Sequence, residues 1–178
     1  MYIPDGIERI LLSEDEIRAK VAEMGAVLTA EYDGANPLFV CVLKGASVFF
    51  ADLIRQVECP LEIAFLRAES YGGGEQSCGS VRLTAGADID IEGRDVVVVE
   101  DILDTARTLY SLKNELLKRN PKSLKIVTLL DKPSRRAIKG FSADYCGFAV
   151  EDLFVVGYGL DFDEKYRNLR YIGIKKKD

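Results

Sequence analysis

The chain has 178 residues, of which 48% are apolar and 30% are charged, and its formal net charge is −5. At this size a single domain, residues 1–178, should bury roughly 70% of the surface that the unfolded chain exposes. The composition excludes a disordered or fibrous protein, and the negative charge argues against nucleic acid as a partner. The chain holds no histidine, which excludes histidine-based acid–base catalysis and the usual zinc sites. Any chemistry must therefore use carboxylates, lysine, backbone groups or a metal ion.

The first twenty residues carry acidic side chains and lack a basic segment followed by an apolar one, and no apolar run approaches the length of a membrane span. These features predict a cytoplasmic protein with no membrane partner. The four cysteines are scattered without a Cys-x-x-Cys pair, and Cys41 and Cys146 lie inside apolar runs typical of strands. Buried free thiols are therefore favoured over a disulfide framework.

The first predicted element is an amphipathic helix over residues 13–32. Ser13 and Glu16 have the spacing of a capping box, and apolar residues then recur from Ile17 to Leu28 at helical spacing. Further along the chain, strands are predicted at 38–43, 61–68, 96–100 and 123–130, and helices at 47–57 and 105–119. The strand runs are continuously apolar, which is typical of strands covered on both faces. We therefore expect an α/β fold with a mainly parallel central sheet flanked by helices.

Two segments break this alternation of strands and helices. Residues 69–79 hold four glycines and no apolar periodicity, which predicts a mobile surface loop followed by a strand-like segment at 81–84. The last thirty residues are dense in aromatic residues and glycine without a clean period. We expect them to form a cap folded over the sheet edge.

The stretch VVVVEDILDTART, residues 96–108, points to a binding site. A buried strand runs into Glu100 and Asp101, and Asp104 then opens a turn of small and hydroxyl-bearing residues. In a parallel sheet, ligands gather beyond the carboxyl ends of the strands, where the N-terminus of a helix offers free N–H groups to a phosphate. Sugar hydroxyls and Mg²⁺ are partners that suit carboxylates beside a phosphate. The stretch therefore predicts a phosphorylated sugar bound together with magnesium.

Other interpretations of these residues are open from the pattern alone. Asp104 could be an ordinary N-cap of the helix that follows it. A phospho-receiver domain also carries strand-end carboxylates and a lysine, but it places its acidic residues after two different strands and has no use for a glycine-rich loop or an aromatic cap. Lys132 directly follows the strand at 123–130, so topology alone places it at the same sheet edge as Asp101 and favours it for the site.

The stretch 96–108 resembles the phosphoribosyl-pyrophosphate signature of the type I phosphoribosyltransferases. Four further segments agree in order and spacing with bacterial hypoxanthine-guanine phosphoribosyltransferases: VLKGASVFFADL at 42–53, SYGGG at 70–74, LLDKPSRR at 129–136 and DLFVVGYGLDFDEKYRNLRYIG at 152–173. The resemblance covers roughly residues 38–173. It implies the type I phosphoribosyltransferase fold, with a small hood made mainly by about 150–178 together with the N-terminal segment.

The resemblance also implies a role for each matching residue at the sugar and phosphates. The ribose and 5′-phosphate would be held by Glu100, Asp101, Asp104, Thr105, Ala106, Arg107 and Thr108, with Asp104 facing N7 of the purine as the proton carrier. The pyrophosphate would be held by Lys44, Gly45, Ser70, Tyr71 and Arg167. The loop at Lys44 and Gly45 would contain a cis peptide, and Ser70 and Tyr71 would belong to a closing lid.

For the purine and the metal, the resemblance implies a second group of residues. The purine would be bound by Lys132, Phe154, Val155 and Asp161, with Lys132 donating to the 6-oxo group and Phe154 stacking on the ring. Mg²⁺ would be held by Glu100, Asp101 and Asp161. On spacing alone, however, Phe154 could be part of the core, and Lys44 and Arg167 could be solvated surface charges.

One position departs from the family pattern. Where the family commonly has glycine in the phosphate turn, this chain has Ala106. A methyl group there disfavours a positive φ by an amount of order 1 kcal/mol. A small residue still fits, so Ala106 stays within the predicted phosphate turn.

The implied activity is purine salvage, in which the 5-phosphoribosyl group passes from phosphoribosyl pyrophosphate to hypoxanthine or guanine with Mg²⁺, giving IMP or GMP and pyrophosphate. The resemblance further implies a homodimer or homotetramer. The rival from another class is a regulatory protein that kept the fold and binds RNA. Such a protein would need a basic face, against which the net charge of −5 argues.

Overall fold

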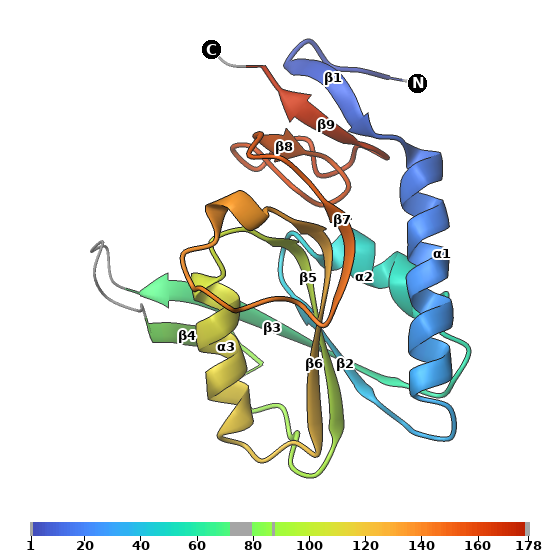
Figure 1. The fold of residues 1–178 in the computed structure, drawn as a ribbon, viewed down its shortest axis with the longest axis vertical. Coiled ribbons are helices and arrows are strands. Elements are labelled where there is room, and N and C mark those ends of the chain that lie inside the picture. The colour runs from blue at the N-terminus through green and yellow to red at the C-terminus, as the bar shows by residue number, and fades with distance from the viewer. Residues whose placement is uncertain (1, 72–79, 87, 177–178) are drawn as a thin grey trace.

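The structure is a computed structural model that describes residues 2–71, 80–86 and 88–176 (Figure 1). Its helices are α1 (Glu14–Glu31), α2 (Ser47–Ile54), α3 (Arg107–Leu117) and the short 3-10 helix η1 (Pro133–Arg135). Its strands are β1 (Ile7–Leu12), β2 (Leu38–Val42), β3 (Glu62–Tyr71), β4 (Ser80–Ala85), β5 (Asp95–Leu103), β6 (Ser123–Asp131), β7 (Tyr145–Ala149), β8 (Val155–Val156) and β9 (Ile172–Lys175). Within these ranges no helix combines the length and the apolar character that crossing a membrane requires.

Six strands form the central sheet, in the order β4-β3-β2-β5-β6-β7. Five neighbouring strands are parallel to one another, namely β3, β2, β5, β6 and β7. The edge strand β4 runs antiparallel to β3. In the middle of the sheet, Val40 of β2 lies between Ala64 of β3 and Val98 of β5. The predicted α/β fold with a mainly parallel sheet is confirmed.

Helices cover both faces of the middle of this sheet, which explains why β2 and residues 96–99 of β5 are continuously apolar. The prediction that the strand at 61–68 is also covered on both faces is wrong, since Ile63 and Phe65 of β3 are exposed. Val97 and Val99 of β5 pack into a core with α1 and α2, whereas Val96 and Val98 pack into a second core with α3. Figure 1 shows α1 and α3 on opposite sides of the sheet. Because successive side chains of a strand point to opposite faces, a strand with a core on each face needs an apolar residue at every position.

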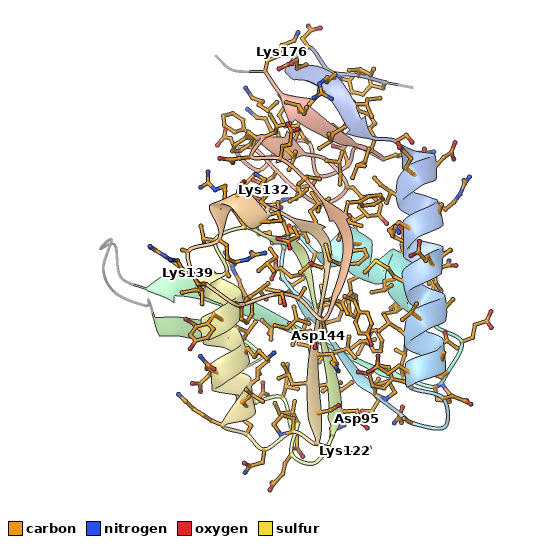
Figure 2. All side chains as sticks on the ribbon, viewed as in Figure 1. Asp95, Lys122, Lys132, Lys139, Asp144 and Lys176 are labelled. Carbon is orange, nitrogen blue, oxygen red and sulfur yellow. The ribbon has the colours of Figure 1, made fainter. Side chains whose placement is uncertain are left out.

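The small sheet, made of β1, β9 and β8 in that order, joins the beginning of the described chain to its end. It is antiparallel and has its own cluster of buried side chains, which are Ile7, Val156, Leu169 and Tyr171. In Figure 1 it stands beyond one end of the central sheet, and in Figure 2 Lys132, directly after β6, lies on that side. Asp95 and Lys122, at the amino ends of β5 and β6, lie at the opposite end (Figure 2). The small sheet therefore faces the carboxyl ends of the parallel strands.

The element boundaries differ from the predictions at two places that matter for the site. The helix predicted at 105–119 begins at Arg107, because the preceding residue, Ala106, has a left-handed backbone with φ 69°. Strand β5 continues to Leu103 instead of ending at Glu100, so the acidic pair lies inside the strand. The capping box of the first helix is confirmed, since Glu16 N–H donates to Ser13 Oγ and Ser13 N–H donates to Glu16 Oε2.

Other predictions were incomplete, wrong or fall outside the described residues. Strands β1, β7, β8 and β9 were not predicted, and three of them form the small sheet where an irregular cap was expected. The prediction that Cys146 is buried is wrong, since it is exposed on the edge strand β7, whereas Cys41 is buried and free as expected. Cys78 and the part of the predicted loop at 72–79 lie outside the described residues.

Candidate active site

The acidic pair lies near the carboxyl end of β5, where Glu100 pairs with Thr128 of the neighbouring strand β6. Asp101 is buried, with 8% of its surface exposed, and Glu100 is partly buried. Burial raises the pKa of both carboxyls, and the negative charge of Asp101 raises the pKa of Glu100 further. The backbone N–H of Ile102 donates to Asp101 Oδ1 at 2.7 Å and partly opposes this effect. A cation or hydroxyl donors bound at the pair would favour its ionised form.

The loop after β2 packs directly on this pair. The peptide bond between Leu43 and Lys44 is cis, as the resemblance implied for this loop. A methyl group at Gly45 would overlap the Oδ2 atom of Asp101, so only glycine allows the backbone to approach the carboxylate this closely. A methyl group at Gly159, which has φ 101°, would overlap the carbonyl oxygen of Gly45. The two glycines therefore bring the loop after β2, the acidic pair and the segment after β8 into contact.

A cavity of about 210 Å³ opens where β5 turns into α3. It is lined by Val42, Leu43, Glu100, Asp101, Ile102, Leu103, Asp104, Thr105, Ala106, Thr108 and Leu109. Ala106 is the N-cap residue of α3 but provides no side-chain cap, and the hydroxyl of Thr105 accepts a long hydrogen bond of 3.4 Å from the N–H of Arg107. The positive end of the α3 dipole thus points into a cavity whose other wall is acidic, a combination that suits a phosphorylated sugar.

Asp104 lies between the acidic pair and the phosphate turn. It is not the N-cap of α3, since that position belongs to Ala106, so the capping interpretation of Asp104 is wrong. Its carboxylate oxygen Oδ1 forms an ion pair with Nε of Arg135 at 2.8 Å, and its backbone carbonyl accepts a hydrogen bond from Arg136 at 2.9 Å. Neither arginine was predicted as a site residue, although both stand in the segment LLDKPSRR.

Lys132 follows β6 and is buried, with 7% of its surface exposed. Its backbone N–H donates to the carbonyl of Leu103, which ties the end of β6 to the end of β5. No hydrogen bond or ion pair of its ammonium group is found in the part of the chain that the structure describes. The Nζ atom is not among the enclosed polar atoms without a partner, so it reaches solvent and could donate to a ligand carbonyl.

The segment from Phe154 to Arg167 faces this end of the central sheet. Phe154 is 55% exposed and contacts Phe162 edge to face at 5.6 Å, so the interpretation of Phe154 as core is wrong. Val155 is buried in β8. Asp161 Oδ1 pairs with Arg167 at 2.8 Å, and Asp161 Oδ2 accepts the N–H of Glu164 at 2.9 Å.

The two cations predicted to bind pyrophosphate share one carboxylate that the sequence analysis did not consider. Glu164 lies 2.9 Å from Nζ of Lys44 and 3.4 Å from Arg167, and Lys44 lowers the pKa of Glu164. Arg167 also donates to the carbonyl of Gly159 at 2.8 Å. The structure therefore brings Lys44 and Arg167 to one place, and neither is an isolated surface charge.

The remaining predicted residues lie on β3, the neighbour of the edge strand β4, or at the start of α3. Ser70 and Tyr71 lie on β3 and pair with Val81 and Ser80 of β4. The rest of the predicted lid, 72–79, lies outside the described residues. Arg107 is exposed at the start of α3 and does not line the cavity.

In residues 2–71, 80–86 and 88–176, no three acidic or cysteine side chains are grouped closely enough to bind a metal by themselves. Glu100 and Asp101 nevertheless fit Mg²⁺, which takes one or two carboxylates and completes its shell with substrate and water oxygens. Their raised pKa values are the sign expected of two neighbouring buried acids that a cation would stabilise. Asp161 is paired with Arg167 and would have to exchange that partner to bind a metal.

Comparisons with known proteins agree on one family. The family model described as "phosphoribosyl transferase domain" matches residues 9–163. The hypoxanthine-guanine phosphoribosyltransferase of Bacillus subtilis is 51% identical over 96% of this chain and 94% of its own. The bifunctional protein TilS/HprT of Listeria innocua is 50% identical over 97% of this chain, which spans only 26% of that longer protein. A crystal structure of a hypoxanthine phosphoribosyltransferase from Staphylococcus aureus superposes with a TM-score of 0.92 at 44% identity, covering 97% of this chain and 93% of that one.

Proposed function

The chain belongs to the phosphoribosyltransferase family, and on that premise we propose that it transfers the 5-phosphoribosyl group from phosphoribosyl pyrophosphate to hypoxanthine or guanine. The products would be IMP or GMP and pyrophosphate. The observation that carries the proposal is the cavity in which the acidic pair, Asp104 and the N-terminus of α3 meet. The names of relatives at about half identity over nearly the whole chain support the same purine substrates.

We assign the sugar and its 5′-phosphate to this cavity. Glu100 and Asp101 would accept hydrogen bonds from the two ribose hydroxyls, since ionised carboxylates are acceptors only. The phosphate would lie against the turn from Thr105 to Thr108, where the backbone N–H groups and the helix dipole favour an anion. Mg²⁺, held by Glu100 and Asp101 with substrate oxygens, would neutralise part of the pyrophosphate charge when it is bound.

The leaving group would be received by Lys44 and Arg167. In the structure both are paired with Glu164, whose side chain is 66% exposed. Ion pairs to a carboxylate in water are weak, so pyrophosphate can displace the Glu164 carboxylate at small cost. Departure of pyrophosphate leaves a positively charged ribosyl centre, and cations fixed on the leaving group stabilise the charge that develops.

Asp104 would receive the N7 proton as the purine attacks, because a carboxylate in contact with the base can serve where the chain offers no histidine. Lys132 would donate to the 6-oxo group of the base, which supplies the acceptor that its ammonium group lacks in the described chain. Phe154, exposed at the edge of the small sheet, would stack on the ring, and Val155 and Asp161 would contact its other edge.

These assignments predict which bases are used. Adenine presents an amino donor where Lys132 needs an acceptor, so it should be rejected. Xanthine presents a 2-oxo group to backbone carbonyls that the family resemblance places near Val155 and Asp161, so its kcat/KM should be about ten- to a hundred-fold below that of guanine. Hypoxanthine has no group at that position and should be accepted.

The test is to mix the protein with Mg²⁺, phosphoribosyl pyrophosphate and each of the four bases, and to measure pyrophosphate and nucleotide. We expect product from hypoxanthine and guanine. If neither hypoxanthine nor guanine yields pyrophosphate, the proposed function is wrong. Rapid turnover of adenine would show that Lys132 does not bind the 6-position of the base. The homodimer or homotetramer and the cytoplasmic location stay predictions.

A further inference from the structure

Arg135 connects three separate segments around the proposed proton carrier. It lies in η1, and its Nε is 2.8 Å from Oδ1 of Asp104, at the end of β5. Its Nη1 is 3.4 Å from Oδ1 of Asp152, two residues before Phe154. The negative charges of Asp104 and then Asp152 raise the pKa of Arg135, so the guanidinium stays charged.

The neighbouring arginine has a different task. Arg136 is largely buried, donates to the backbone carbonyls of Leu103 and Asp104 and pairs with Asp131. It therefore fixes the main chain at the end of β5. Arg135 contacts the side chain of Asp104 instead, through an ion pair at 2.8 Å with Oδ1. Protein encloses this oxygen, and no donor in the described chain meets it with hydrogen-bond geometry, so the charge of Arg135 is what compensates it. Oδ2 is then the carboxylate oxygen left for a ligand.

The side chain of Asp104 has a competing partner nearby. An aspartate just before a helix usually caps the first N–H groups of that helix. Asp104 comes three residues before α3, whose N-cap residue Ala106 provides no side-chain cap and whose first N–H has only a long bond of 3.4 Å to the Thr105 hydroxyl. A carboxylate that turned onto the start of α3 would occupy the place proposed for the 5′-phosphate and would leave the base. The ion pair with Arg135 holds the Asp104 carboxylate away from the start of α3.

We propose that Arg135 is a positioning residue for the reaction: it holds Asp104 with Oδ1 engaged and Oδ2 directed to the base, and it keeps this carboxylate away from the phosphate turn. The inference rests on the proposed function, since it presupposes that Asp104 carries the purine proton. Arg135 itself contacts neither substrate in this account.

A double-mutant cycle tests the coupling, with kcat measured for the wild type, Arg135→Gln, Asp104→Asn and the double variant. Arg135→Gln should lower kcat by roughly ten- to thirty-fold, because a misplaced catalytic group can cost up to about a hundred-fold. The KM for phosphoribosyl pyrophosphate should rise as well, by a few fold, because the freed carboxylate competes with the phosphate. In the Asp104→Asn background the same substitution should change kcat less than about two-fold, because a group that acts through Asp104 has nothing left to position.

Two further variants guard against a general effect on folding. Arg135→Lys keeps a positive charge and should recover part of the lost kcat. Lys122→Gln removes a cation from an ion pair with Asp95 at the opposite end of the sheet, at 2.7 Å, and should leave kcat unchanged in both backgrounds (Figure 2). An equal fold-loss from Arg135→Gln with and without the Asp104 carboxylate would overturn the proposal.

The outcomes also separate this inference from the proposed function. If the wild type forms no nucleotide from hypoxanthine, the proposed function fails before the cycle is read. If the wild type is active and Asp104→Asn is impaired but the cycle is additive, only the role of Arg135 is refuted.

Discussion

Replacing Glu100 by glutamine should stabilise the ligand-free protein at neutral pH and at the same time weaken its binding of phosphoribosyl pyrophosphate. Burial and the charge of Asp101 raise the pKa of Glu100, so the folded protein holds a proton that the unfolded chain has already released. The free energy of unfolding therefore falls as the pH rises from the unfolded carboxyl value of about 4.3 through the raised folded value. Glutamine carries no charge at any of these pH values, so the variant does not lose this part of the free energy of unfolding as the pH rises.

The size of the effect is bounded by the proton linkage. Each pH unit over which the folded state holds one more proton is worth about 1.4 kcal/mol, so the wild type can lose at most about 4 kcal/mol between the unfolded carboxyl pKa and pH 7. Glu100 is only partly buried and an amide also loses some hydration, so we expect a net gain of about 1–2 kcal/mol for Glu100→Gln. For a chain of this size that is a rise in Tm of roughly 3–6 °C.

The assay is thermal unfolding of both proteins in the absence of ligand at several pH values from 5 to 8. The gain should be small at the acid end and grow with pH. Glu92→Gln, at an exposed position, is the matched control and should show no such trend. Adding Mg²⁺ and phosphoribosyl pyrophosphate should raise the Tm of the wild type more than that of Glu100→Gln. Parallel pH curves for the two proteins, or a less stable variant at pH 8, would refute the reasoning.

Three further substitutions test other parts of the site. Asp104→Asn keeps the size of the side chain but cannot take the N7 proton, so kcat should fall about 10²–10³-fold. Binding of phosphoribosyl pyrophosphate, measured by its effect on Tm, should be nearly unchanged. Near-normal turnover would exclude the proton-transfer role. Lys132→Gln removes an ammonium group that has no acceptor in the described chain, so kcat/KM for hypoxanthine should fall about 10–100-fold while Tm does not fall. An unchanged kcat/KM would place the base elsewhere. Ala106→Gly relieves the left-handed φ of 69° but loses a buried methyl group, so Tm should change by less than about 3 °C. The matched control Ala22→Gly, in the middle of α1, should cost about 1 kcal/mol, and an equal loss at both positions would show that φ at residue 106 is unimportant.

The sequence determined the layers of the fold because those signals are local. The capping box at Ser13, the continuous valines of β5 and the helical spacing after them each depend on neighbours a few residues away. A strand that is apolar on both faces needs a helix on each side, and the structure has α1 and α2 on one face and α3 on the other. The position of the acidic stretch at the carboxyl end of a parallel strand follows from the same pattern.

The small sheet could not be predicted in this way. Ile7 of β1 pairs with Lys175 of β9, and β8 has two residues, so neither periodicity nor length marks these strands. Their stability comes from partners at the other end of the chain. The same holds for Ala106, whose left-handed φ is imposed by the turn between β5 and α3 and disagrees with the preference of alanine.

The residue types and their spacing indicated most of the candidate site, but only the tertiary structure determined which of its charged side chains form ion pairs. Two sets of ion pairs join segments that lie far apart along the chain or on different elements. One set joins Glu164 to Lys44 and Arg167, and the other joins Arg135 to Asp104. A charged side chain is stable in water as well as in an ion pair, so its position in the sequence does not indicate which partner it has. The carboxyl ends of β2, β5 and β6 had to meet at one end of the sheet before these partners could be identified.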